Sequence, residues 1–185
     1  MSAGFKLPIH LGRWIDENRH LLKPPVGNKK IYEDNDFMVF IVGGPNARKD
    51  FHIDPSEELF YQLEGAITLK LALPDGSFQD VVVGEGELFL LPSYIPHSPR
   101  RPANTIGLVI EHKRPAGADD GLRWYCESCG DILHEAHFPL TDIVGQLKAA
   151  IEGFMADEAA RTCKKCGAVM DDPTGSKEIA AGQGG

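Results

Sequence analysis

Long apolar runs and an excess of basic residues are both missing from this chain of 185 residues. No apolar stretch reaches the roughly 18 to 20 residues that a helix needs to cross a bilayer. The formal net charge of −8 has the wrong sign for a general nucleic-acid binder, which presents a basic face. Hydrophobic residues still make up 42% of the chain, which is enough for a packed core. We therefore expect a folded protein that binds neither membrane nor nucleic acid.

We also expect no secretory signal, because Pro8, His10 and Arg13 interrupt the first residues. This absence favours a reducing, cytoplasmic setting, in which cysteines are metal ligands more often than disulfides. The chain has 4 cysteines, arranged as two C-x-x-C pairs: Cys126 with Cys129, and Cys163 with Cys166. A glycine follows each pair, Gly130 or Gly167, and lets backbone amides turn toward the sulfurs as in a rubredoxin knuckle. Two such knuckles predict a tetrahedral site for zinc or a single iron. We expect this closed site to pin the C-terminal helix to the rest of the protein.

Short β-rich runs occupy the middle of the chain. Runs such as MVFIVGG, ELFYQLEG and TIGLVIEHK are separated by turns rich in Gly, Pro and Asp, with no amphipathic helix between them. This pattern predicts an all-β sandwich or barrel. We divide the chain into an N-terminal arm at 1–28, a barrel core at 29–115, a C-terminal extension at 116–170 and a disordered tail at 171–185. The arm has apolar residues at near-helical spacing, ended by Pro24-Pro25, and the extension has one expected helix near 141–161.

The segment FHIDPSEELFYQLEG, residues 51–65, holds more ionisable groups than a core strand normally does. His52 and Asp54 can share one face of a strand, and a bend near Pro55 can return Glu58 beside them. A second segment, GEGELFLLPSYIPH, ends at His97. Two imidazoles and one carboxylate leave open positions on an octahedral metal and suit ferrous iron. Asp54 could also approach the metal, so its role stays open. Glu57 and Glu58 point to opposite faces of a regular strand, so only one of them can reach the metal.

Together the two segments resemble the two cupin motifs. The first motif is matched from His52 through Glu58 to Gly65, with Asp54 in place of a second histidine. The second is matched from Gly86 to His97, with Tyr94 in place of a glycine. The resemblance implies a jelly-roll barrel whose mouth binds metal and ligand, with three protein ligands instead of four.

A closer resemblance covers the chain from about Arg13 to Gly167. RWIDENRHLLKPPVGN, VGGPNARKDFHIDPSEELFYQLEG, FLLPSYIPHSPRRP and LVIEHKRPAGADDGLRWYCESCG strongly resemble the 3-hydroxyanthranilate 3,4-dioxygenase family, in its microbial single-cupin form with a four-cysteine site. The resemblance implies a ferrous, extradiol-type dioxygenase that converts 3-hydroxyanthranilate and O2 to 2-amino-3-carboxymuconate semialdehyde. That product closes without an enzyme to quinolinate, a precursor in NAD biosynthesis on the kynurenine pathway of tryptophan degradation.

The same resemblance implies the roles of individual residues. His52, Glu58 and His97 would bind the catalytic iron, with Glu58 also beside the substrate. Arg48 and Arg101 would bind the substrate carboxylate through planar forks, and Arg100 would lie outside the pocket. Glu111 would accept a proton from the phenol or amine, or hydrogen-bond to it. Asn28 would lie at the pocket entrance, and His134 and His137 are expected to be ordinary surface residues.

Two other readings of the site remain open at this stage. A cupin can host another metal-dependent reaction, such as isomerisation or oxygenation of a different small aromatic acid, because the fold does not fix the chemistry. A non-catalytic ligand sensor or zinc-knuckle interaction module is the third candidate. We also expect a homodimer, because the exposed edge strands of single cupins commonly pair.

Overall fold

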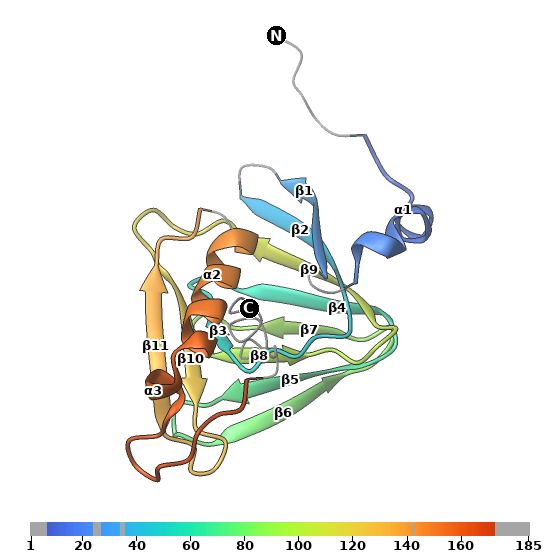
Figure 1. The fold of residues 1–185 in the computed structure, drawn as a ribbon. Helices are drawn as coiled ribbons and strands as arrows, with labels where there is room; N and C mark the ends of the chain where they lie inside the picture. Colours follow the sequence, from blue (N-terminus) through green and yellow to red (C-terminus); the bar gives the residue numbers. More distant parts are fainter. Residues whose placement is uncertain (1–6, 24–26, 34–35, 142, 173–185) are drawn as a thin grey trace, which may run out of the picture.

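Two antiparallel β-sheets form the body of the computed structural model, which describes residues 7–23, 27–33, 36–141 and 143–172 (Figure 1). The five-stranded sheet has the order β1 (Asn28–Glu33), β2 (Phe37–Gly43), β9 (Ile106–His112), β4 (Glu58–Glu64) and β7 (Leu88–Leu91). The six-stranded sheet has the order β11 (Ile132–Phe138), β10 (Asp120–Tyr125), β3 (Phe51–Ile53), β8 (His97–Arg100), β5 (Ile67–Ala72) and β6 (Phe78–Val83). The predicted all-β class is confirmed.

The core lies between the two sheets and follows the two-residue period of their strands. Phe40, Phe60, Leu91 and Val109 come from the five-stranded sheet, and Leu69 comes from β5 opposite them. Along β5, Ile67, Leu69 and Leu71 all point to this core, while the residues between them are less buried. One face of each sheet is therefore buried, and the chain forms a sandwich of the predicted jelly-roll type.

The N-terminal arm contains the expected helix. α1 (Leu11–Asn18) is followed by a short 3-10 helix, η1 (Arg19–Leu21). Ile15 and Leu22 pack against Ile41 and Ile106 of the five-stranded sheet, so the arm covers part of its outer face. The expected stop at Pro24-Pro25 falls outside the described residues.

The C-terminal extension holds two strands that the sequence analysis did not anticipate. β10 pairs with β3 of the barrel and with β11, so the extension lengthens the six-stranded sheet. Arg123 of β10 lies directly opposite Glu135 of β11, and such charged residues hide a strand from hydrophobicity patterns. The C-terminal helices lie beside these strands in Figure 1.

The single helix expected near 141–161 is two helices, α2 (Ile143–Ala156) and α3 (Glu158–Arg161). Asp157 separates them and caps α3, because its side chain accepts hydrogen bonds from the amides of Ala159 and Ala160. α2 packs on the extension through Phe154, whose ring stacks on Trp124 with centroids 4.3 Å apart. None of the described helices is long and apolar enough to cross a membrane. Most of the predicted tail, residues 173–185, lies outside the described residues.

Candidate active site

Three neighbouring strands bring His52, Glu58 and His97 together inside the barrel. His52 of β3 and His97 of β8 are direct cross-strand partners, and Glu58 begins β4 in the facing sheet. All three side chains are buried, and one potential ligand atom of each lies within 4.8 Å of the others. Glu58 Oε2 lies 2.7 Å from His97 Nε2, and Glu58 Oε1 lies 3.9 Å from His52 Nδ1. The structure therefore assembles the predicted triad from residues far apart in the sequence.

Both imidazole rings are held in orientations that suit a metal. His97 Nδ1 lies 3.0 Å from the carbonyl oxygen of Ile95, and His52 Nε2 lies 2.7 Å from Asp120 Oδ2. One nitrogen of each ring is thus engaged by an oxygen acceptor, and the other faces Glu58. Glu58 Oε2 is buried but accepts no hydrogen bond of good geometry from the described residues. Lone pairs converging on one point without a donor fit a divalent cation.

The charge of Glu58 is maintained by the two histidines. Burial raises the pKa of Glu58, but His97 and then His52 outweigh burial and lower that pKa to about 2. For His97 the balance runs the other way, since burial lowers its pKa while Glu58 leaves it raised. The triad therefore offers an anionic carboxylate, as a metal centre requires.

A narrow cavity of ≈ 90 Å³ opens beside the triad. Its walls include every residue predicted for the substrate pocket: Asn28, Arg48, Arg101 and Glu111, together with His52, Glu58 and His97. Asn46 and Leu147, which the sequence analysis did not single out, also line it. Asn46 Oδ1 accepts a hydrogen bond of 3.0 Å from the Arg101 amide, so it helps to place that arginine.

The two arginines in the cavity differ in their partners. Arg48 forms an ion pair with the fully buried Asp50, which binds both Nε and Nη2 of its guanidinium. Arg101 is also buried, but its Nη1 has no hydrogen-bond partner among the described residues. Burial and the neighbouring charge of Arg48 lower the pKa of Arg101 to about 10, so it stays protonated at neutral pH. A buried guanidinium that lines a cavity and keeps an N–H without a partner is suited to bind an anion.

Arg100 lies outside this cavity, as expected. Side chains alternate along β8, so His97, Pro99 and the following Arg101 line the cavity while Arg100 points away. Its Nη1 donates to the carbonyl oxygen of Arg48. The two adjacent arginines therefore have different surroundings, although the sequence alone presents them as equivalent charges.

Glu111 lies directly opposite Glu58, where β9 pairs with β4. Burial and then the charge of Glu58 raise the pKa of Glu111 well above its usual value. Asp54 is buried in the same acidic group, but its Oδ1 accepts hydrogen bonds from the backbone and hydroxyl of Ser56 at the turn before β4. Glu57 is exposed, as the alternation of side chains predicted.

Two charged residues of the site escaped the sequence analysis. Arg114 follows β9, and its Nη1 donates to Glu111 Oε2 over 2.7 Å. Asp120, at the start of β10, binds Arg114 Nε and Nη2 over 2.8 and 2.7 Å, and also contacts His52. Their available signal was a charged pair flanking a turn, HKRPAGADDG, which is common at protein surfaces.

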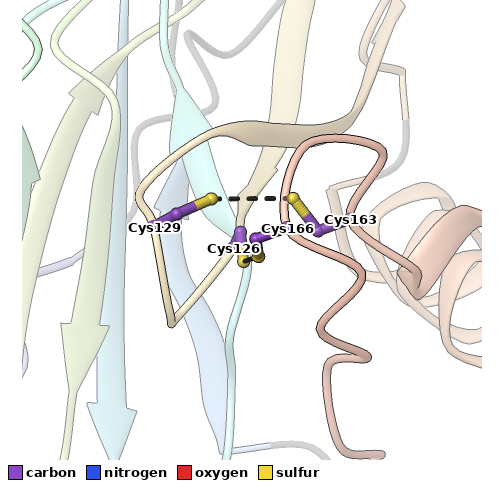
Figure 2. A group of neighbouring side chains, drawn as sticks. All are labelled: Cys126, Cys129, Cys163 and Cys166. Carbon is purple, nitrogen blue, oxygen red and sulfur yellow. Dashed lines mark hydrogen bonds between the residues drawn. The ribbon is translucent and has the colours of Figure 1, made fainter.

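The cysteines form a second, separate cluster (Figure 2). Cys126 Sγ lies 3.5 Å from Cys166 Sγ, and Cys129 Sγ lies 3.6 Å from Cys163 Sγ. The two C-x-x-C segments form turns of the same kind. In each, the amide of the following glycine donates to the carbonyl oxygen of the first cysteine: Gly130 to Cys126 over 2.8 Å, and Gly167 to Cys163 over 2.9 Å. Backbone amides of Cys166 and Lys165 lower the pKa of Cys163 to about 7, despite the opposing effect of burial. Four sulfurs around one point fit a tetrahedral metal.

The nearby histidines behave as predicted for ordinary surface residues. His137 is exposed and pairs with Glu135. His134 packs its ring on Trp124 and Phe154, with centroids 5.7 Å away in each case. Neither belongs to a group of potential ligands among the described residues.

A larger hollow of ≈ 620 Å³ lies on the other side of the six-stranded sheet. Phe78, Tyr94, Tyr125 and Arg123 contribute to its walls, but none of the triad residues does. Arg123 is already paired with Glu135 there. Size alone would favour this hollow, whereas the converging ligands and the free guanidinium lie in the smaller cavity.

A jelly-roll sandwich with two histidines and one carboxylate converging in its interior defines the class: the protein is a cupin with a candidate metal site in the barrel. The sequence profile of the 3-hydroxyanthranilic acid dioxygenase family matches residues 4–155. The chain is 54% identical over 164 residues to the 3-hydroxyanthranilate 3,4-dioxygenase of Neurospora crassa, with 89% of this chain and 90% of the relative covered. It is 58% identical over 158 residues to the enzyme of that name from Jannaschia sp., covering 84% and 87%. The chain belongs to the 3-hydroxyanthranilic acid dioxygenase family, which confirms the predicted family and enzyme class.

Proposed function

We propose that the protein is a ferrous-iron enzyme that converts 3-hydroxyanthranilate and O2 to 2-amino-3-carboxymuconate semialdehyde. Relatives carrying the name 3-hydroxyanthranilate 3,4-dioxygenase at 54% and 58% identity support the substrate. The observation that carries the proposal is that Arg101 is buried, lines the same cavity as the triad, and has an Nη1 without a hydrogen-bond partner among the described residues. An aromatic acid can place its carboxylate on this arginine while its other substituents face the metal ligands.

His52, Glu58 and His97 would hold the iron, leaving the rest of its coordination sphere to substrate and gas. When bound, ferrous iron supplies the electron transfer that allows dioxygen to react with an aromatic ring. Arg101 and Arg48 bind and orient the substrate carboxylate, and Asn28 lies in the cavity wall beside them.

Glu111 would handle the proton of the substrate's phenol or amine. Its Oε2 is occupied by Arg114, so its other oxygen is the one available to substrate. A raised pKa makes this carboxylate a stronger base than an exposed glutamate. Glu58 lies directly opposite, and its negative charge contributes to the raised pKa of Glu111, which supports Glu111 rather than Glu58 as the proton acceptor.

The test is anaerobic loading of the purified protein with ferrous iron, followed by air and 3-hydroxyanthranilate. We expect uptake of one O2 per substrate and the yellow absorbance of the muconate semialdehyde, which fades as quinolinate forms. Labelled dioxygen should place both of its atoms in the product. Absence of oxygen uptake with 3-hydroxyanthranilate and with other 2-aminophenol acids would contradict the proposal and favour a different cupin activity.

For the cysteine cluster we propose a structural site for zinc or a single iron. The two knuckles belong to the β10–β11 connection and to the segment after α3, so one metal would tie the C-terminal helices to the barrel's sheet. The four sulfurs leave no open coordination position for a substrate. Metal analysis of protein purified without added metal identifies the ion.

The cellular setting extends the same proposal. The product would supply quinolinate for NAD biosynthesis on the kynurenine pathway of tryptophan degradation, in the cytoplasm. We also propose a homodimer, which the exposed Leu88 and Leu90 on the edge strand β7 support. Light scattering measures the oligomeric state, and quinolinate auxotrophy of a deletion strain tests the pathway.

A further inference from the structure

Arg114 binds three buried carboxylates at the back of the candidate active site. Its side chain is only 7% exposed, and we call this group the Arg114 cluster: Arg114, Asp54, Glu111 and Asp120. Nη1 reaches Glu111, Nε reaches Asp120, and Nη2 reaches both Asp120 and Asp54. All three nitrogens of the guanidinium are therefore engaged, which fixes its plane.

The cluster connects two parts of the site that have different tasks. On one side, Asp120 Oδ2 lies 2.7 Å from His52 Nε2, the nitrogen that faces away from Glu58. On the other side, Glu111 lines the substrate cavity, and Arg114 donates to its Oε2. Arg114 itself does not line the cavity. It can therefore influence substrate binding through the residues that it holds, without lining the substrate cavity itself.

One guanidinium faces three carboxyl groups in this cluster. Asp120 is fully buried and lies between His52 and Arg114. Loss of the Arg114 guanidinium would therefore remove the contact that fixes the orientation of Asp120 toward His52. A lysine at position 114 would keep one positive charge but could not supply donors in three directions within one plane.

We propose that Arg114 is a positioning residue that orients two groups: the metal ligand His52, through Asp120, and the pocket carboxylate Glu111, by direct contact. Metal affinity and substrate alignment then both depend on this one side chain. This inference rests on the proposed function, because it assigns His52 to a metal and Glu111 to the substrate. Loss of a partner behind a ligating histidine typically weakens metal binding or activity about 10- to 100-fold.

The main variant is Arg114→Lys, which keeps the charge and removes the fork. Binding is followed with Co²⁺ without substrate, and cobalt held by thiolates is recognised by its intense charge-transfer absorption. The cobalt bound at the triad is the total bound cobalt minus the amount that this absorption assigns to the thiolates. We expect about tenfold weaker cobalt binding at the triad, unchanged binding at the cysteines, and a loss of kcat/KM that exceeds the loss in metal affinity.

Two further variants separate the two branches of the Arg114 cluster. Asp120→Asn should weaken cobalt binding at the triad with a smaller effect on KM. Glu111→Gln should lower kcat without weakening cobalt binding. Because Arg114 acts through Asp120 on the metal, the double variant Arg114→Lys/Asp120→Asn should bind cobalt no more weakly than the weaker of the single variants.

Arg123→Lys is the matched control, since Arg123 also binds a carboxylate, Glu135, but lies on the far side of the sheet from the triad. This variant should leave both the cobalt affinity of the triad and kcat/KM unchanged. Wild-type affinity in Arg114→Lys, or additive effects in the double variant, would overturn the positioning role. If Arg114→Lys does not fold, Asp120→Asn decides alone, and unchanged cobalt binding overturns the proposal. Failure of the wild type to oxidise 3-hydroxyanthranilate would instead contradict the proposed function.

Discussion

The barrel site and the cysteine site both gather potential ligands, but the chain builds them in opposite ways. In the barrel, His52 and His97 meet because β3 pairs with β8 in a particular register, and Glu58 meets them from β4 of the facing sheet. In the extension, the same local turn is used twice, with Gly130 and Gly167 at φ values of 74° and 76°. The barrel site therefore depends on the global fold, whereas each half of the cysteine site is encoded within a few residues.

The surroundings of the two sites differ as well. The triad faces a cavity that also contains Arg101, whose Nη1 has no partner in the described part of the chain, and Glu111, whose pKa is raised. The cysteines face one another, with backbone amides behind them. Unsatisfied and perturbed groups are typical of sites of chemistry, and symmetrical closed ligand sets are typical of structural metals.

The largest effect is expected from His52→Ala. This change removes a triad nitrogen and leaves Asp120 without its imidazole partner. Activity should fall to background, well beyond the roughly 100-fold that loss of an outer partner can cost. Metal analysis with cobalt should show an empty triad beside a filled cysteine site. Retention of full activity by this variant would remove the triad from the mechanism.

Cys126→Ser should affect stability first and activity second. We expect the extension to lose at least about 3 kcal/mol, since metal binding at such sites contributes on the order of 10 kcal/mol to folding. Proteolysis should then cleave after the barrel, and thermal unfolding should begin earlier. Turnover per triad-bound metal should stay near the wild-type value in the cold. If turnover disappears while the triad metal and the fold persist, the cysteine site is not merely structural.

Arg101→Met tests whether the unpartnered guanidinium is reserved for the substrate. KM should rise about 10- to 100-fold, because a hydrogen bond between charged groups contributes roughly 1.5–3 kcal/mol. Metal content should not change, because Arg101 contacts no triad ligand in the described hydrogen bonds and ion pairs. Arg100→Lys, at the adjacent position, is the control and should leave KM within about threefold. Equal effects of the two variants would contradict the assignment.

The two regions also differ in what sequence could predict. The cysteine spacing indicated its site without any knowledge of strand pairing, because each knuckle is local. The triad was recognised from a motif resemblance, which also assigned Arg101 to the pocket and left Arg100 outside, while the alternation of side chains separated Glu58 from Glu57. Local periodicity and motif spacing were therefore sufficient wherever neighbours in sequence decide the outcome.

Arg114 and Asp120 could not be found in this way. Asp120 contacts His52 because β10 pairs with β3, and Arg114 is connected to His52 through Asp120. The charged Asp120 and Arg123 interrupt the apolar pattern of β10, so the sequence analysis did not recognise it as a strand. Buried charges that satisfy one another leave no hydrophobic pattern, and in sequence they look like a solvated turn. Residues that act through long-range polar contacts therefore become visible only when the sheet register is known.

The smallest expected effect compares two glycines, one from each region. A Cβ at Gly107 of β9 would lie 3.0 Å from Arg101 Nη1 and 2.8 Å from Gln62 Oε1. Gly107→Ala should displace the guanidinium and raise KM about three- to tenfold, with about 1–3 kcal/mol of lost stability. Steady-state kinetics and denaturant unfolding measure the two effects.

Gly153 of α2 provides the counterpart, because a Cβ there meets no atom within 4 Å beyond the local backbone of its own helix. Gly153→Ala should stabilise the helix by about 0.4–1 kcal/mol and leave KM unchanged, since alanine restricts the unfolded chain and favours helix. The same added methyl group would thus harm the barrel and help the extension. If Gly107→Ala kept the wild-type KM, the space beside Gly107 would not determine where the Arg101 guanidinium lies. The unpartnered Nη1 of Arg101 would then not be evidence for substrate binding.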